Sequence, residues 1–295
     1  MEAKKANLFI VGAMKAGTTS FAHVLSQHPE IFISPIKEPH FFVNPLPKQF
    51  METSRFFSLN DYFKNKYPAP LHRAQIMDAV QYQHLFLNAS TEKYLAEAST
   101  SYLHAPEAAK RIFNYNAEAK IIVLTRDPLQ RAFSHYNMDL GLGRVRKSFA
   151  DVMARDLNQY KKGILPWYSY LNMSCYQKPM QIYRKIFRDV LVISLEGLME
   201  NTAAELEKVV QFLAISRFTD FSFPHLNEGR SFKSQKVFYL MKKLGFKDWF
   251  SRYIGTEAKK RILKRVSSET KAPMDLPEML RREVEEVCRY KNKSP

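Results

Sequence analysis

Short apolar runs recur along the chain, and a stretch with helical periodicity follows each of them. Four runs have strand character and lack the polar alternation of a half-exposed strand: residues 8–12, 93–97, 120–125 and 190–195. Runs of this kind are typical of strands that are covered on both faces of a parallel sheet. The pattern therefore predicts an α/β fold built on such a sheet.

Helical patterns separate the apolar runs, and we expect helices at residues 18–27, 105–115, 128–140, 148–160, 174–187 and 202–214. Because strands alternate with helices, the helices should flank a parallel sheet. From about residue 234 onward the pattern predicts a helical C-terminal region without strands. Residues 43–75 predict loop and short helix over the sheet edge. No linker divides the chain, so we expect one domain over residues 1–295.

The first apolar run leads into a turn bounded by Gly12 and Gly17, and then into a helix. A strand, a glycine-bounded turn and a helix N-terminus form a phosphate-binding arrangement. In the form GxxxxGK[ST], the lysine follows the second glycine. Here Thr18 and Thr19 follow that glycine, and Lys15 stands inside the turn. The sequence predicts a phosphate loop of P-loop type with a displaced lysine.

A second anion site is expected where the apolar run 120–125 ends. Arg126 stands at the carboxyl end of this run, where open α/β sheets bind their ligands. Together with Ser134 it could hold a phosphate. The alternative is that Arg126 pairs with Asp127 or a neighbouring carboxylate. A metal-dependent nucleotide hydrolase needs an acid at such a strand end, so an arginine there predicts phosphate binding without a metal.

The helix after this strand has a well-specified start. Asp127 has the character of an N-cap, Pro128 takes the first helical position, and Gln130 is placed to complete a capping box. Arg131 and Ser134 are three residues apart, so we expect them on one face near the helix N-terminus.

The formal net charge of +16 predicts attraction to anions such as a polyphosphorylated cofactor, an acidic glycan, nucleic acid or an anionic membrane. A generally basic surface without a dedicated partner explains the charge equally well. The chain has no recognisable nucleic-acid module. No window approaches the roughly 20 apolar residues of a membrane span. We therefore expect neither nucleic-acid binding nor a membrane-spanning segment.

The two cysteines, Cys175 and Cys288, make neither a disulfide framework nor a zinc site. The apolar run near the N-terminus stops at a loop glycine and does not fit a secretory signal. We expect a cytoplasmic, reduced protein.

Two motifs more than 100 residues apart resemble those of sulfotransferases that use 3′-phosphoadenosine 5′-phosphosulfate (PAPS). "VGAMKAGTTSF" resembles their 5′-phosphosulfate loop, and "RDPLQRAFSHY" resembles their 3′-phosphate site. "SPIKEPHFF", residues 34–42, is similar to the segment that carries the catalytic glutamate in heparan-sulfate-type and related bacterial enzymes. "EASTSYL", residues 97–103, resembles the end of their second strand, although Ala98 stands where heparan-type enzymes carry a lysine.

The resemblance implies an enzyme that transfers a sulfonate from PAPS to a hydroxyl or amine of a glycan or small metabolite. It implies that Glu38 is the base, that His40 orients it or replaces it, and that Lys15 stabilises the leaving phosphate. No metal is implied. The donor site implied by the resemblance is lined by Lys15, Ala16, Gly17, Thr18, Thr19, Ser20, Arg126, Ser134, Arg230 and Lys233.

Two other functions remain open on the sequence. One is a P-loop kinase or other nucleoside triphosphate enzyme, which the displaced lysine and the arginine at the strand end disfavour. The other is a non-catalytic basic protein that binds polyanions, which would not account for the loop. The aromatic run 165–176, with Trp167, Tyr168 and Tyr170, falls where the family's acceptor cleft lies, although such runs are more often core or lid packing.

Overall fold

The computed structural model describes residues 4–50, 57–222, 231–232, 267–268 and 274–289. At its centre is a sheet of five parallel strands in the order β2-β3-β1-β4-β5. The strands are β1 (Leu8–Gly12), β2 (Ile31–Ile33), β3 (Tyr94–Ala98), β4 (Lys120–Thr125) and β5 (Val190–Ser194). The α/β fold with a parallel sheet is therefore confirmed.

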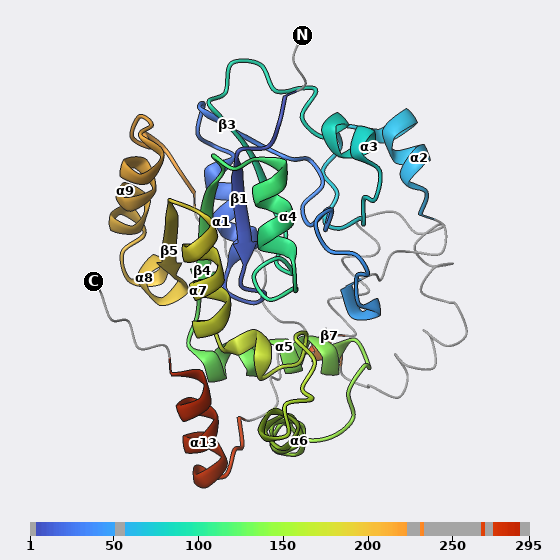
Figure 1. The fold of residues 1–295 in the computed structure, drawn as a ribbon, viewed down its shortest axis with the longest axis vertical. Coiled ribbons are helices and arrows are strands. Elements are labelled where there is room, and N and C mark those ends of the chain that lie inside the picture. The colour runs from blue at the N-terminus through green and yellow to red at the C-terminus, as the bar shows by residue number, and fades with distance from the viewer. Residues whose placement is uncertain (1–3, 51–56, 223–230, 233–266, 269–273, 290–295) are drawn as a thin grey trace.

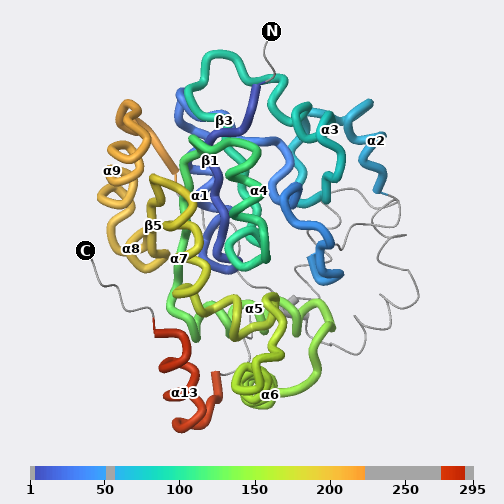
Figure 2. Tube along the Cα trace, in the orientation of Figure 1, coloured from blue at the N-terminus to red at the C-terminus, as the bar shows by residue number. Residues whose placement is uncertain are grey.

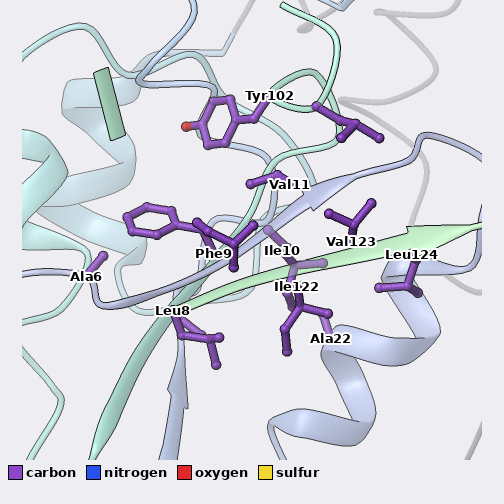
Figure 3. Close-up of a cluster of buried hydrophobic side chains, with 14 of the residues drawn as sticks. Ala6, Leu8, Phe9, Ile10, Val11, Ala22, Tyr102, Ile122, Val123 and Leu124 are labelled. Carbon is purple, nitrogen blue, oxygen red and sulfur yellow. The ribbon is translucent and has the colours of Figure 1, made fainter. Parts of the chain in front are cut away.

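β1 lies in the middle of the sheet because it is apolar on both faces, and all five of its residues are buried. Leu8 is paired in register with Ala96 of β3 on one side and with Lys120 of β4 on the other. Neighbouring side chains of β1 point to opposite sides of the sheet. Figure 3 shows Phe9 on the side of Tyr102, and Leu8 on the side of Ala22.

Helices cover both faces of the sheet. The chain crosses from β1 to β2 in one direction through α1 (Thr18–Leu25) and from β3 to β4 in the other through α4 (Ala108–Tyr115). Because both crossovers are right-handed, these helices lie on opposite faces. In Figure 1, α4 and α7 (Gln177–Ile186) lie in front of the sheet and α1 lies behind it. α8 (Leu195–Glu200) and α9 (Thr202–Leu213) follow β5 at the sheet edge.

A second apolar cluster lies beyond the carboxyl ends of the strands. It joins α5 (Pro128–Gly141), α6 (Phe149–Lys161) and α13 (Glu278–Cys288), which gather at one end of the molecule in Figure 2. The remaining elements are short: η1 (Lys48–Phe50), α2 (Leu59–Asp61), η2 (Tyr62–Lys66), α3 (Ala79–His84), η3 (Asn172–Ser174), β6 (Ser231–Phe232) and β7 (Ser267–Ser268). None of the described helices combines the length and the apolar character needed to cross a bilayer.

The four predicted strands and the six predicted helices are present with boundaries shifted by a few residues. The sequence did not reveal β2 and α8, because runs of three and six residues are too short to show a period. The C-terminal region contains α13 as expected, but the prediction that it has no strand is wrong. β7 falls within it and pairs antiparallel with β6.

The cysteines are not free, contrary to the prediction of a reduced protein. Cys175 and Cys288 form a disulfide across 113 residues of sequence. The bond ties α13 to the segment in front of α7. On this side of the molecule a cavity of about 450 Å³ lies at the carboxyl ends of β4 and β5, lined by Arg126 and closed in part by Glu285, Cys288 and Arg289.

We expect Cys288→Ala to lower the free energy of unfolding by about 2–4 kcal/mol, because the cross-link restricts the unfolded chain. Chemical denaturation of the wild type and the variant measures this difference. Reductant should lower the stability of the wild type and leave that of the variant unchanged. A wild type that is equally stable with and without reductant would contradict the bond.

Candidate active site

The turn after β1 presents helix N–H groups to an anion. Gly17 precedes α1 in the left-handed conformation, with φ of 84°, and a Cβ at this position would lie 2.7 Å from Cδ1 of Leu195. The turn therefore requires glycine here. The N–H groups of Thr18, Thr19 and Ser20 begin the helix and have no intrahelical partner. Together with the helix dipole, these groups favour a negatively charged ligand.

Two arginines brace this turn from the neighbouring strand and helix. Nη1 of Arg126 donates to the carbonyl of Lys15 at 3.2 Å, and Nη1 of Arg131 donates to the carbonyl of Met14 at 3.4 Å. Lys15 has a φ of 70°, which is uncommon for a residue with a side chain. The two guanidinium groups thus hold adjacent carbonyls of a turn that is itself in an unusual conformation.

Arg131 is fully buried, with 0% of its surface exposed. Its Nε donates to Oγ of Ser174 at 2.7 Å, and Nη2 donates to the carbonyl of Tyr170 at 2.8 Å. Burial lowers the pKa of Arg131 to about 10, so the side chain still carries its charge at neutral pH. No carboxylate of a described residue lies within ion-pair distance, and neutral acceptors therefore support this buried charge.

Lys15 adds a third positive group to the same place. Burial lowers the pKa of Lys15, and the nearby charges of Arg126 and Arg131 lower it further. Among the described residues, no carboxylate forms an ion pair with Lys15 or Arg126. The alternative that Arg126 pairs with Asp127 or a neighbouring carboxylate is not seen among the described residues, where the Asp127 carboxylate caps α5. Three cations around one turn, with no ion-paired carboxylate among the described residues, make this turn a candidate anion site.

At the start of α5 the predicted N-cap is present, but the predicted capping box is not. Oδ1 of Asp127 accepts the N–H of Gln130 at 2.8 Å, as expected of an N-cap. The backbone N–H of Asp127, however, donates to Oε1 of Glu196 at 2.9 Å, so Gln130 does not complete the predicted capping box. Ser134 is half-buried on the same helix, and its hydroxyl makes no hydrogen bond to a described residue.

Glu38 lies buried among positively charged and hydroxyl groups. Its Oε1 accepts from Nζ of Lys37 at 3.0 Å and from Oγ1 of Thr100 at 3.0 Å. Its Oε2 accepts from Nε and Nη2 of Arg73 at 3.1 and 3.0 Å. Burial alone would raise the pKa of Glu38, but Lys37, His40 and Arg73 outweigh it and hold that pKa well below its ordinary value. The carboxylate is ionised at neutral pH.

The backbone around Glu38 is held in a sparsely populated conformation. Glu38 and His40, on either side of Pro39, have φ values of 64° and 50°. The N–H of Glu38 donates to the carbonyl of Ala98 at 2.8 Å, and the N–H of His40 donates to Oγ of Ser99 at 3.1 Å. Residues forced into such regions cluster at functional sites. The conformation makes this loop a candidate for a functional role.

His40 is fully buried beside Glu38, with Nε2 3.5 Å from Oε2 of the carboxylate. Burial lowers the pKa of His40, more than the neighbouring carboxylate raises it. The imidazole is therefore neutral at neutral pH, and its ring nitrogens are available for hydrogen bonds with defined donor and acceptor roles.

The aromatic run at 165–176 packs against the protein. Trp167 stacks on Phe50 with ring centroids 5.6 Å apart. The hydroxyl of Tyr170 donates to Oδ2 of Asp139 at 2.7 Å, and Tyr168 lies against the main core. These contacts support the packing interpretation of the run.

Arg230 and Lys233 lie outside the described residues, so their predicted contact with the donor stays a prediction. The two residues between them form β6, which lies against α5, the helix that carries Ser134.

Several residues that shape the site were not singled out from the sequence for these roles: Arg73, Thr100, Ser101 and Arg131. For Arg131 the sequence contained one indication, since its spacing from Ser134 predicts that both lie on the same face of the helix. The others make contacts with residues 35 to 62 positions away, and no local pattern marks such contacts.

Residues 7–220 match the family model described as "Sulfotransferase family". The chain belongs to the sulfotransferase family. This agrees with the resemblance drawn from the phosphate loop and the strand-end arginine, and the matched region contains Lys15, Glu38, Arg126 and Ser134.

Similar proteins include a bacterial enzyme of known structure and larger animal enzymes. The crystal structure of a sulfotransferase from Alicyclobacillus acidocaldarius is 31% identical with a TM-score of 0.59, over 83% of this chain and 93% of that chain. Bifunctional heparan sulfate N-deacetylase/N-sulfotransferase 3 of Mus musculus is 27% identical over 251 residues, 78% of this chain. Heparan sulfate glucosamine 3-O-sulfotransferase 3B1 of Mus musculus is 26% identical over 229 residues. The matched part is 24% of the first of these two proteins and 50% of the second.

We expect Arg131→Met to lower the free energy of unfolding by about 2–4 kcal/mol, because a buried acceptor left unpaired costs about 1–3 kcal/mol. The carbonyls of Met14 and Tyr170 would both lose their guanidinium donor. Thermal and chemical denaturation measure the loss. Arg217→Met is the matched control, since the Arg217 side chain is 80% exposed and pairs only with Glu207 among the described residues. Equal effects of the two changes would contradict the bracing role.

Proposed function

We propose that the protein transfers a sulfonate group from PAPS to a hydroxyl or amine of a glycan or small-molecule acceptor. The observation that carries this proposal is the place of Lys15. It lies inside a phosphate-binding turn, between Arg126 and Arg131, with no described carboxylate to neutralise it. Membership of the sulfotransferase family supports the same reaction.

The donor carries negative charge at two positions, the 5′-phosphosulfate and the 3′-phosphate. In the proposed complex the former lies against Lys15 and the N–H groups that begin α1, in the turn that also contains Ala16 and Gly17. The latter lies against Arg126 at the end of β4, with Ser134 as a hydroxyl partner. Arg230 and Lys233 are proposed to add further positive charge to this half of the site.

In the proposed reaction the acceptor oxygen or nitrogen attacks sulfur from the side opposite the phosphate. The bond between sulfur and the bridging oxygen breaks, and adenosine 3′,5′-bisphosphate leaves. Negative charge develops on that oxygen, where the ammonium of Lys15 stabilises it. Because the ammonium is buried among other cations, its field is poorly screened and acts strongly on this charge.

Glu38 is proposed to take the proton from the acceptor. Its ionised state at neutral pH suits this role, although a carboxylate of low pKa is a weak base. Proton transfer therefore has to accompany the attack on sulfur. Both carboxylate oxygens already accept hydrogen bonds, so an acceptor must displace one partner. The side chains of Lys37 and Arg73 are 13% and 19% exposed, and we place the approach of the acceptor on their side.

Adenosine 3′,5′-bisphosphate should raise the melting temperature far more than adenosine 5′-phosphate or ATP, because only the first nucleotide fills both proposed phosphate positions. Arg126→Ala should abolish this preference and retain some 5′-phosphate binding. Thermal melts with each nucleotide at matched concentrations test both expectations. Equal stabilisation by all three nucleotides would favour the kinase alternative.

Glu38→Gln should leave binding of adenosine 3′,5′-bisphosphate nearly intact while turnover falls by about 10²–10⁴-fold, the usual effect of losing a general base. Lys15→Ala should lower turnover as well, and it should also weaken nucleotide binding, because the ammonium meets the phosphate before the reaction. Calorimetric titration with the bisphosphate separates the two variants.

His40 is the other candidate for the base. If Glu38→Gln keeps full activity while His40→Ala loses it, the proton goes to His40 and the assignment of Glu38 is wrong.

A further inference from the structure

Three consecutive hydroxyl side chains at the end of β3, Ser99, Thr100 and Ser101, lie beneath the loop that carries Glu38 and His40. Each of them makes a different contact. Ser99 accepts the backbone N–H of His40 at 3.1 Å, and Thr100 donates to Oε1 of Glu38 at 3.0 Å. Ser101 lies 2.8 Å from Nδ1 of His40. The exposed fractions of the three residues are 0%, 2% and 0%, so they face the interior of the protein.

This hydroxyl run is fixed from the side of the sheet. Oγ of Ser99 donates to Oε1 of Glu97 at 2.6 Å, and the hydroxyl of Tyr82 donates to the other oxygen of that carboxyl at 2.5 Å. Glu97 is the penultimate residue of β3 and is fully buried. The hydroxyl run is therefore held by buried residues of the core. Through its contacts with Glu38 and His40, it fixes the loop relative to β3.

The surroundings of the His40 ring favour one tautomer. Nε2 lies 3.5 Å from the ionised carboxylate of Glu38, and a lone pair at this position would be repelled by that charge. The proton therefore belongs on Nε2, and Nδ1 has to accept a hydrogen bond. Ser101 is the donor placed at Nδ1. Its hydroxyl thus orients the ring so that Nε2, a buried atom that makes no hydrogen bond to a described residue, faces the Glu38 carboxylate at 3.5 Å.

The partners of Glu38 fall into an inner and an outer pair. Thr100 and His40 are buried, with 2% and 0% exposed, whereas the side chains of Lys37 and Arg73 are partly exposed. An acceptor that enters from solvent meets the outer pair first and can displace it. The inner pair then remains as the fixed support of the carboxylate.

We propose that Thr100 and Ser101 are positioning residues for sulfonate transfer. Thr100 holds the carboxylate of Glu38, and Ser101 holds the ring of His40 against it. This inference rests on the proposed function, because it assigns the geometry of the proposed base. Neither hydroxyl acts as a nucleophile, since both are closed off from solvent.

Thr100→Val removes the hydroxyl and keeps the shape of the side chain. We expect it to lower kcat/KM for sulfonate transfer by about tenfold, the scale of a lost hydrogen bond to a charged group. Loss of a donor to the ionised carboxylate raises the pKa of Glu38, so the acidic limb of the pH profile should move to higher pH. Binding of adenosine 3′,5′-bisphosphate should not change, and Thr100→Ser should restore both activity and profile.

The other charged and titratable groups that face Glu38 stay the same in this comparison: Lys15, Lys37, His40, His72 and Arg73. Thr202→Val is the matched control, because the Thr202 hydroxyl donates to the carbonyl of Leu198 at the start of α9. It should leave the pH profile unchanged. A Thr100→Val profile that coincides with the wild type would overturn the role of Thr100.

Ser101 is tested by nitrogen-15 NMR of the His40 ring, which needs no turnover. The wild type should show the Nε2–H tautomer, and Ser101→Ala should show a mixture of both tautomers. An unchanged tautomer in the variant would overturn the role of Ser101.

Carbon-13 NMR titration of the Glu38 carboxyl gives the corresponding readout for Thr100→Val, with a higher midpoint expected. If the wild type transfers no sulfonate to any acceptor, the proposed function fails, while both NMR measurements still decide the contacts.

Discussion

Two buried or partly buried guanidinium groups hold the carbonyls of the turn after β1, and the geometry of the site depends on this interaction. Arg126 and Arg131 donate to consecutive carbonyls, those of Lys15 and Met14. The two donors hold the turn that precedes α1, where the first N–H groups of the helix have no intrahelical partner. Arg131 also holds Tyr170 and Ser174, so the same side chain joins the turn to the segment in front of α7.

The order of the strands then brings the two halves of the site together. β1 lies between β3 and β4, and all three strands are parallel. Their carboxyl ends therefore meet at one edge, with the phosphate turn in the middle. Arg126 follows β4 on one side, and residues 99–101 follow β3 on the other. The loop with Glu38 is attached to β3 through the carbonyl of Ala98.

The two halves differ in how their charges are compensated. On the proposed donor side, Lys15, Arg126 and Arg131 have no carboxylate partner among the described residues, and burial and mutual repulsion lower the pKa of Lys15. On the proposed acceptor side, both oxygens of Glu38 accept hydrogen bonds from Lys37, Thr100 and Arg73, and its pKa lies well below the ordinary value. In the proposed function, an anionic donor would therefore neutralise positive charge that the free protein leaves unpaired among its described residues, whereas an acceptor would have to replace existing contacts of Glu38.

The sequence by itself determined the features that depend on neighbouring residues, namely the strands, the helices and the turn between the first strand and helix. The apolar runs predicted four of the five central strands, and the order of strand and helix predicted a parallel sheet. The residues from Leu8 to Leu25 predicted a strand, a glycine-bounded turn and a helix. Only the tertiary structure decided which distant groups meet. The contact of Arg131 with Met14 spans 117 residues, the disulfide of Cys175 and Cys288 spans 113, and Arg73 reaches Glu38 across 35. The periodicity of side chains reports which face of an element is buried, but such contacts depend on which elements pack together, and that is set by the arrangement of the whole core.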